Sequence, residues 1–282
     1  MFALKQKLSR RLARHLHTST VAARAFGPIV SFTFDDAPVS AAAQGAPILE
    51  DEGVRGTFYL SGAMIGGRSD IQPIVSADQV RELAQKRHEI ACHTYGHLEL
   101  CRQDLRCLAA DLEQNRQTLS AISGAPPTNF AYPYGRPSFS TKRLLQSQFT
   151  TCRGIYPGIN SDRIDLGLLF AVPLYECDDA EILRWIDAVV ERRGWLIFVT
   201  HDVQDGPTPV GTTPKQLTSY VHAARQLGCA CLTVDNAIKR ILKASKRPAP
   251  GEVDRASARP TTEPERDLGE MQPAESRALA RL

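Results

Sequence analysis

The stretch PIVSFTFDD, residues 28–36, decides the fold class of this chain. Its first seven residues are mostly β-branched or aromatic, the composition of a buried strand, and it ends in the adjacent carboxylates Asp35 and Asp36. The arrangement recurs twice, because EIAC at 89–92 precedes HTYGH at 93–97 and WLIFVT at 195–200 precedes His201. Strands that repeatedly end in His and Asp are typical of the active-site face of an α/β barrel. The pattern therefore predicts an enzyme.

The composition limits the class of protein. With 282 residues, 43% of them hydrophobic, the chain can bury one sizeable core. Its formal net charge of +3 is too small to indicate a nucleic-acid partner. No run approaches about 20 apolar residues, so we expect no transmembrane span. The seven cysteines lack the spacing of a disulfide framework or a four-cysteine zinc site, which favours a reducing compartment.

Residues 1–26 form a basic leader that differs in composition from the rest of the chain. Its basic residues are Lys5, Lys7, Arg10, Arg11, Arg14 and Arg24, and it contains no acidic residue. Leucine recurs at every fourth position from Leu4 to Leu16, so a helix would carry these leucines on one face. Such a segment could touch a membrane surface, act as an organellar transit sequence, or be an unstructured leader. No continuous apolar run follows the charges, so we expect no secretory signal peptide and a cytoplasmic protein.

The C-terminal segment 246–282 has the composition of a disordered tail. It has no aromatic residue, five prolines and mixed charges, so it cannot bury enough apolar surface to offset the entropy of ordering. We therefore expect a single folded domain over residues 27–245.

Strand and helix signals alternate between these two segments. Besides the first strand, the predicted strands are 57–60, 89–92, 195–200 and 229–234. Capping boxes start helices at Ser76 and Thr213, and a third helix ends at Gly124. The residues that this third helix is expected to turn inward are Leu105, Leu108, Leu112, Leu119 and Ile122. Repeated β–α units of this length imply a parallel sheet, open or closed into a barrel.

Four ordered motifs resemble those of the polysaccharide deacetylases, the NodB-homology group also called carbohydrate esterase family 4. The motifs are TFDD at 33–36, HTYGH at 93–97, FAYPYG at 130–135 and VTH at 199–201. The resemblance spans roughly residues 28 to 240, with the motifs in the family's order and approximate separation. It implies a distorted (β/α) barrel of the NodB type and a hydrolase that removes N-acetyl groups from an amino-sugar oligomer or polysaccharide.

The residue types support hydrolysis independently of the resemblance. Two neutral imidazoles four residues apart and one carboxylate can make a two-histidine, one-carboxylate metal site with open positions for water and substrate. Zinc is the expected metal for a hydrolase, although cobalt, manganese or iron would fit these ligands. Such a metal lowers the pKa of its bound water towards about 7 and polarises a carbonyl group. A neighbouring carboxylate can take the proton of the water, and a histidine opposite can protonate the departing amine.

The resemblance assigns these roles to individual residues. The metal ligands that it implies are Asp36, His93 and His97. Asp35 would be the general base and His201 the general acid. The backbone N–H of Tyr134 would complete the oxyanion hole that stabilises the tetrahedral intermediate. The residues expected to contact the sugar are Tyr132, Pro133 and Trp195, although Tyr132 and Trp195 could equally pack in the core.

One position departs from the family pattern. Many members carry an arginine where this chain has Ala131, and in the family that arginine pairs with the base carboxylate. Without it we expect the pKa of Asp35 to be higher than in relatives that have the arginine. The candidates for orienting His201 are Asp178, Asp179 and Asp202.

Two other functions remain open at this stage. One is an amidase of the same fold that acts on a small or lipid-linked molecule, which the missing secretion signal favours. The other is a non-catalytic carbohydrate- or metal-binding protein, for which Ala131 is the only support in the sequence. For the deacetylase that the resemblance implies, the expected partner is a carbohydrate that contains N-acetylated amino sugars.

Overall fold

The stretch at residues 28–36 forms β2 (Ile29–Asp35), a strand in which every residue is buried. It pairs in parallel with β3 (Thr57–Leu60) on one side and with β9 (Trp195–Thr200) on the other. A parallel strand in this position is covered on both faces, which suits its β-branched and aromatic composition. The computed structural model describes residues 9, 12–13, 16, 18–22, 26–69, 72–175 and 177–246.

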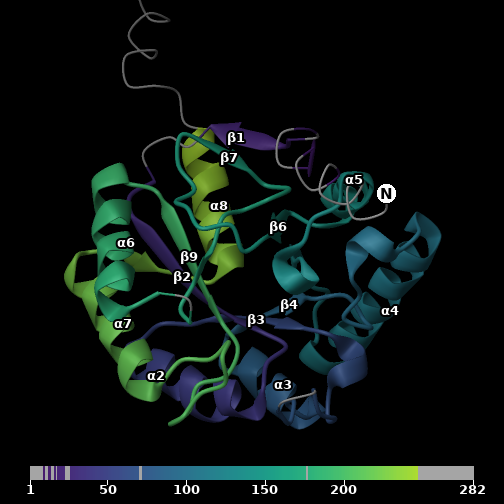
Figure 1. Cartoon of the computed structure of the whole chain (residues 1–282), viewed down its shortest axis with the longest axis horizontal. Helices are drawn as coiled ribbons and strands as arrows, with labels where there is room; N and C mark the ends of the chain where they lie inside the picture. The colour runs from purple at the N-terminus through teal and green to yellow at the C-terminus, as the bar shows by residue number, and fades with distance from the viewer. Residues whose placement is uncertain are drawn as a thin grey trace, which may run out of the picture. The chain divides into compact units, whose positions relative to one another are not determined.

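The main sheet has eight parallel strands in the order β6-β5-β4-β3-β2-β9-β8, with β10 paired to β2. The strands not yet defined are β4 (Glu89–Cys92), β5 (Asn129–Ala131), β6 (Thr151–Arg153), β8 (Val172–Pro173) and β10 (Ala230–Cys231). The strand path runs from β6 to β8 without closing, so the sheet is an incomplete barrel (Figure 1). This confirms the prediction of a distorted (β/α) barrel.

Helices cover the outside of the sheet. They are α2 (Ala46–Asp51), α3 (Ala77–Gln85), α4 (Leu105–Ser123), α5 (Phe139–Gln148), α6 (Asp179–Arg192), α7 (Pro214–Gln226) and α8 (Val234–Ser245). Figure 1 shows α6, α7, α2, α3 and α4 following one another around the sheet. Four single turns complete the list: the π-turn η1 (Ala41–Gly45) and the 3₁₀ turns η2 (Gly62–Met64), η3 (Leu100–Arg102) and η4 (Pro133–Gly135). No helix within the described part of the chain is long and apolar enough to cross a membrane.

The local helix signals are confirmed. Ser76 and Gln79 form the predicted capping box of α3, and Thr213 and Gln216 form that of α7. Helix α4 ends at Gly124, whose φ of 83° lies in the left-handed region that glycine adopts without a steric penalty. These features depend on side chains three or four residues apart, so the sequence alone specifies them.

Three local predictions are wrong or incomplete. The predicted strand 229–234 is a strand only at Ala230–Cys231, because the side chain of Thr233 accepts the Asn236 N–H and starts α8. A short apolar run does not by itself distinguish a strand from the first turn of a buried helix. Leu105, expected to face inward, is 46% exposed. None of the helices α2, α5, α6 and α8 was predicted.

A second, two-stranded sheet joins the leader to the domain. In it β1 (Thr20–Ala22) pairs antiparallel with β7 (Arg163–Asp165). The rest of the leader is described only at Ser9, Leu12–Ala13, Leu16, 18–19 and Phe26. The predicted tail lies outside the described residues from 247 onward.

Candidate active site

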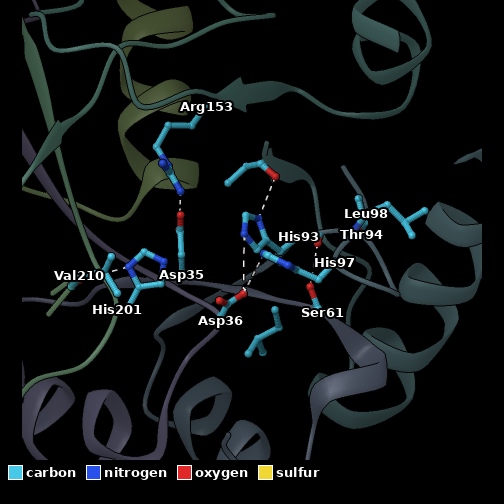
Figure 2. A network of polar contacts seen from close by, with 12 residues as sticks. Asp35, Asp36, Ser61, His93, Thr94, His97, Leu98, Arg153, His201 and Val210 are labelled. Atoms are coloured by element: carbon cyan, nitrogen blue, oxygen red, sulfur yellow. Dashed lines mark hydrogen bonds and ion pairs between the residues drawn. The ribbon is translucent and has the colours of Figure 1, made fainter. Parts of the chain in front are cut away.

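The candidate residues come together because the carboxyl ends of parallel strands meet at one edge of a sheet. Asp35 ends β2 and Asp36 follows it, His93 follows β4, and His201 follows β9. Figure 2 shows Asp36 beside His93 and His97, and Asp35 between His201 and Arg153. Five of the predicted residues, which follow or end three strands, therefore lie in one place.

Asp36, His93 and His97 form a group that could hold a metal ion. One ligand atom from each lies within 4.8 Å of the others. The Nε2 atoms of His97 and His93 lie 3.4 Å and 3.8 Å from Asp36 Oδ1. That oxygen is buried and has no hydrogen-bond partner among the described residues. A buried, unpartnered carboxylate oxygen is costly unless something binds it, so the donor set fits a divalent cation.

The protonation state of His93 also suits a metal ligand. Its Nδ1 lies 2.9 Å from the carbonyl oxygen of Ala131 and must donate to it, because a carbonyl only accepts. Burial lowers the pKa of His93 to about 4, so the imidazole is neutral at neutral pH. The Nε2 lone pair therefore faces Asp36, in the orientation that a hydrogen-bonded ligand histidine adopts.

The loop between the two histidines is a turn and not a helix. Asp111 on α4 holds it, because its carboxylate accepts the backbone N–H groups of Tyr95 at 2.7 Å and Gly96 at 2.9 Å. Thr94 and His97 have φ angles of 63° and 50°, which non-glycine residues rarely adopt. Such conformations persist where the surrounding structure enforces them, commonly at functional sites. The four-residue spacing thus brings both rings to Asp36 through a constrained turn.

Asp35 has a charge partner that the sequence analysis did not identify. The guanidinium of Arg153, at the end of β6, donates from Nη2 to Asp35 Oδ1, and both side chains are buried. The guanidinium lies 4.8 Å from the centre of the Tyr59 ring. Burial opposes ionisation of Asp35 and would raise its pKa. The charge and hydrogen bond of Arg153, together with the nearby His93 and His201, more than offset burial and hold the pKa of Asp35 below its ordinary value.

This contact corrects the prediction that Ala131 leaves Asp35 without a cationic partner. Ala131 and Arg153 are paired neighbours on β5 and β6, so an arginine one strand away reaches the same carboxylate. Ala131 and Ala91 pack against Tyr59 inside the barrel, and their small side chains leave room for the long one of Arg153. The premise of a lost cationic partner is therefore wrong, and the pKa of Asp35 lies below its ordinary value. The only signal in the sequence was a single charge in the short apolar stretch TCRG.

His201 is oriented by a backbone carbonyl, and none of the three candidate aspartates does so. Its Nδ1 lies 3.3 Å from the carbonyl oxygen of Val210, which leaves Nε2 to exchange a proton. Asp178 instead caps α6, and Asp179 accepts from Tyr220 Oη at 2.6 Å. Asp202 accepts the Thr208 N–H at 2.9 Å.

The predicted sugar contacts are divided between two environments. Tyr132 is fully buried and donates its hydroxyl to the carbonyl of Gly167 at 2.9 Å. Trp195 is also buried, donates to Ser31 Oγ, and starts β9 at the end of the sheet away from the site. Both therefore pack in the core, and neither ring is available to a sugar in this structure. Pro133 is buried in the turn η4.

Tyr134 differs from its neighbours because its side chain is exposed. It is 53% exposed, and its ring lies edge-on to that of His97 with centroids 4.8 Å apart. Its φ of 58° sets the turn η4 beside the metal ligands. The structure thus brings Tyr134 to the histidine side of the site and His201 to the Asp35 side.

Comparison with known proteins agrees with this geometry. The polysaccharide deacetylase family profile matches residues 24–150. A chitin deacetylase from Pestalotiopsis sp is 30% identical over 117 residues, which cover 42% of this chain and 36% of that protein. The profile covers less than half of the chain, so it is the segment 24–150 that resembles the polysaccharide deacetylase family. The chain's matches span less than half the length of the curated relatives.

Solved structures show the same fold. The Xyl-CE4 domain of a multidomain xylanase from the hindgut metagenome of Trinervitermes trinervoides has a TM-score of 0.52 at 15% identity, covering 76% of this chain and 91% of that one. A family 4 carbohydrate esterase from Bacillus anthracis has a TM-score of 0.53 at 13% identity, covering 78% and 86%. The family profile ends at residue 150, so the positions of Arg153 and His201 rest on the structure.

Proposed function

We propose that this protein is a metal-dependent hydrolase that removes N-acetyl groups from an amino-sugar oligomer or polysaccharide. The observation that carries the proposal is the open oxygen of Asp36, faced by the Nε2 atoms of His93 and His97. A buried carboxylate, Asp35, and a histidine, His201, lie beside this group. The match of residues 24–150 to the polysaccharide deacetylase profile and the similarity to a chitin deacetylase support the reaction class.

Asp36, His93 and His97 would hold the divalent metal, and zinc is the expected ion for a hydrolytic site with these ligands. Cobalt or manganese would fit the same donors. When bound, the metal would polarise the amide carbonyl and lower the pKa of water at the site.

The other residues divide the proton transfers. Asp35, kept ionised by Arg153, would take the proton of the attacking water. His201, fixed through Nδ1 by Val210, would deliver a proton from Nε2 to the departing amine. The backbone N–H of Tyr134 would stabilise the oxyanion, and its exposed ring offers an apolar face to a sugar.

The test measures metal content and acetate release from chitooligosaccharides for the wild type and for His97→Ala. His222→Ala is the matched control, because His222 lies on the exposed face of α7 and contacts Glu52. We expect metal and acetate release in the wild type and the control, and loss of both in His97→Ala.

Two results would contradict parts of the proposal. Metal binding with turnover of simple amides but not of chitooligosaccharides would replace the sugar substrate with a small amide. Absence of bound metal after reconstitution with zinc and with cobalt would remove the hydrolase proposal altogether.

A further inference from the structure

The described part of the leader packs on the domain as an arm, by which we mean Ser9, Leu12–Ala13, Leu16 and Thr18–Ala22. Its strand β1 pairs with β7, and Ser19 accepts the Leu166 N–H at 2.9 Å. Ala13 is fully buried, whereas Leu12 and Leu16 are 36% and 45% exposed. The domain therefore covers Ala13 and leaves the two described leucines, Leu12 and Leu16, partly exposed.

The arm meets a buried lysine on the domain. Lys142, on α5, is completely inaccessible, and its Nζ donates to Ala13 O at 2.8 Å, Leu16 O at 3.3 Å and Asp165 Oδ2 at 2.6 Å. An ammonium group has three N–H donors, so all three are used. The two arm carbonyls end a helical turn closed by the Leu16 N–H to Leu12 O bond, where carbonyls lack partners and favour a cation. Without the arm, Lys142 would keep only one of these acceptors.

The arm also completes the start of α5. The N-cap residue of that helix, Ser138, makes no capping hydrogen bond through its side chain. Ser9 Oγ instead accepts the N–H of Phe139, the first residue of α5, at 3.1 Å. A residue 130 positions away thus supplies an acceptor for one of the first N–H groups of α5, which have no partner within the helix.

Two routes connect the arm to the candidate oxyanion turn. Helix α5 begins shortly after η4, the turn that carries Tyr134. Asp165, which accepts from Lys142 and from the Ser19 N–H, also accepts the Gly167 N–H at 3.0 Å. Gly167 in turn accepts the hydroxyl of Tyr132, two residues before Tyr134. The arm is therefore linked to η4 from both sides.

We propose that the arm is a permanent part of the functional domain, with Lys142 as its docking site, and that it positions the turn bearing Tyr134. The positioning role rests on the proposed function, whereas the docking of the arm does not.

The first experiment is hydrogen exchange on the full chain, with Lys142→Met compared with Arg143→Met. Arg143 is the exposed neighbour of Lys142 on α5, so it controls for a lost cation on the same helix. We expect Lys142→Met to speed exchange at least about tenfold in residues 12–22, 139–142 and 163–166, with no change for Arg143→Met. Wild-type exchange in residues 12–22 of Lys142→Met would overturn the docking role.

A second experiment covers the case in which Lys142→Met does not fold. A specific protease site is inserted between Ala22 and Phe26 of the otherwise wild-type chain, and the folded protein is cut there. We expect the cut arm to remain bound through gel filtration, and Ser9→Ala to weaken its retention. Release of the wild-type arm with full solubility and unchanged exchange in α5 would overturn the proposal.

Activity measurements then separate docking from positioning. We expect Lys142→Met to lower kcat several-fold while KM and metal content remain at wild-type values, because its effect reaches η4 and not Asp36. An unchanged kcat in a variant with a mobile arm would overturn the positioning role alone. A wild type without deacetylase activity would instead contradict the proposed function and leave the docking result intact.

Discussion

The two ends of the barrel sheet both bury ionisable groups, but only one end pairs all of their polar atoms. At the amino end, the Glu89 carboxylate accepts from Thr57 Oγ1 at 2.9 Å, Asn129 Nδ2 at 2.7 Å and the Asp235 N–H at 2.8 Å. At the carboxyl end, Asp36 Oδ1, Tyr59 Oη and Arg153 Nε have no hydrogen-bond partner within the described part of the chain. A carboxylate with filled lone pairs fixes strands and helices in place, whereas one with an open lone pair can bind a ligand.

Backbone conformation follows the same division. Of the eight non-glycine residues with positive φ that the structure describes, Asp36, Ala37, Thr94, His97 and Tyr134 all adjoin the candidate site. Cavities are not confined to the carboxyl end, because one of about 360 Å³ lies at the amino end beside His88 and Glu89. The unpartnered polar atoms and the positive φ angles therefore distinguish the functional end, whereas cavity volume does not.

The largest expected effect comes from removing the open oxygen itself. Asp36→Ala should reduce bound metal to background and acetate release by at least about 10³-fold. Its metal-free melting temperature should stay equal or rise, because the substitution removes an unpartnered buried oxygen. Metal analysis, an acetate assay and calorimetry check this, with the exposed Asp78→Asn as control. If Asp36→Ala retained bound metal, the unpartnered oxygen of Asp36 would not be what distinguishes the carboxyl end of the sheet.

Arg153→Met should affect both catalysis and stability. It leaves the buried Asp35 without its ion-pair partner, so we expect about 3–5 kcal/mol lower unfolding free energy and roughly 10²-fold lower activity. The pKa of Asp35 should rise, since the strongest influence that opposes burial is then lost, and the acidic limb of the pH–rate profile should move to higher pH. Arg153→Lys keeps the charge but loses the planar guanidinium group, so its stability and activity should lie between those of the wild type and of Arg153→Met. A wild-type acidic limb in Arg153→Met would show that Arg153 does not act on Asp35.

At the amino end, a substitution should change stability without changing catalysis. Asn129→Ala removes a donor to Glu89 and the acceptor of Thr151 Oγ1, which lies at 2.7 Å. We expect the unfolding free energy to fall by about 1–3 kcal/mol while kcat/KM and metal content stay at wild-type values. Urea unfolding alongside the acetate assay, with the exposed Gln148→Ala as control, checks this. A large loss of activity at unchanged stability would mean that the two ends are not separate in role.

The smallest expected effect is a pH dependence of stability at the amino end. His88 is buried, accepts the Gly56 N–H on Nδ1 at 3.0 Å and donates to Glu50 Oε1 from Nε2 at 3.1 Å. Burial lowers its pKa despite the attraction of the Glu50 carboxylate, so the folded protein binds this proton less readily than the unfolded chain. Stability should therefore fall as pH drops below about 6.5, by at most about 1.4 kcal/mol per pH unit for this proton.

Thermal unfolding between pH 7.5 and 5 measures this slope. His88→Gln should flatten it by up to one proton's contribution while leaving metal content unchanged. An identical slope in wild type and His88→Gln would show that His88 is not the titrating group.

Sequence reasoning succeeded where the determinants are local. The strand ahead of Asp35, the capping boxes at Ser76 and Thr213 and the stop at Gly124 depend on neighbouring residues only. It failed where a short apolar run could form either a strand or the start of a buried helix. The run at 229–234 starts α8, because Thr57 Oγ1 and Glu89 accept the first N–H groups of that helix.

For the candidate site, the sequence by itself determined which residue types end the strands. Parallel strands bring their carboxyl ends together, so the convergence of Asp36, His93 and His97 follows from strand composition and order. Only the tertiary structure decided which side chains face one another. Arg153 reaches Asp35 through the register of β5 and β6, Val210 orients His201 from a distant loop, and Lys142 is enclosed by the arm. These contacts join residues far apart in the chain, and the energy that selects them arises only when both partners are buried together.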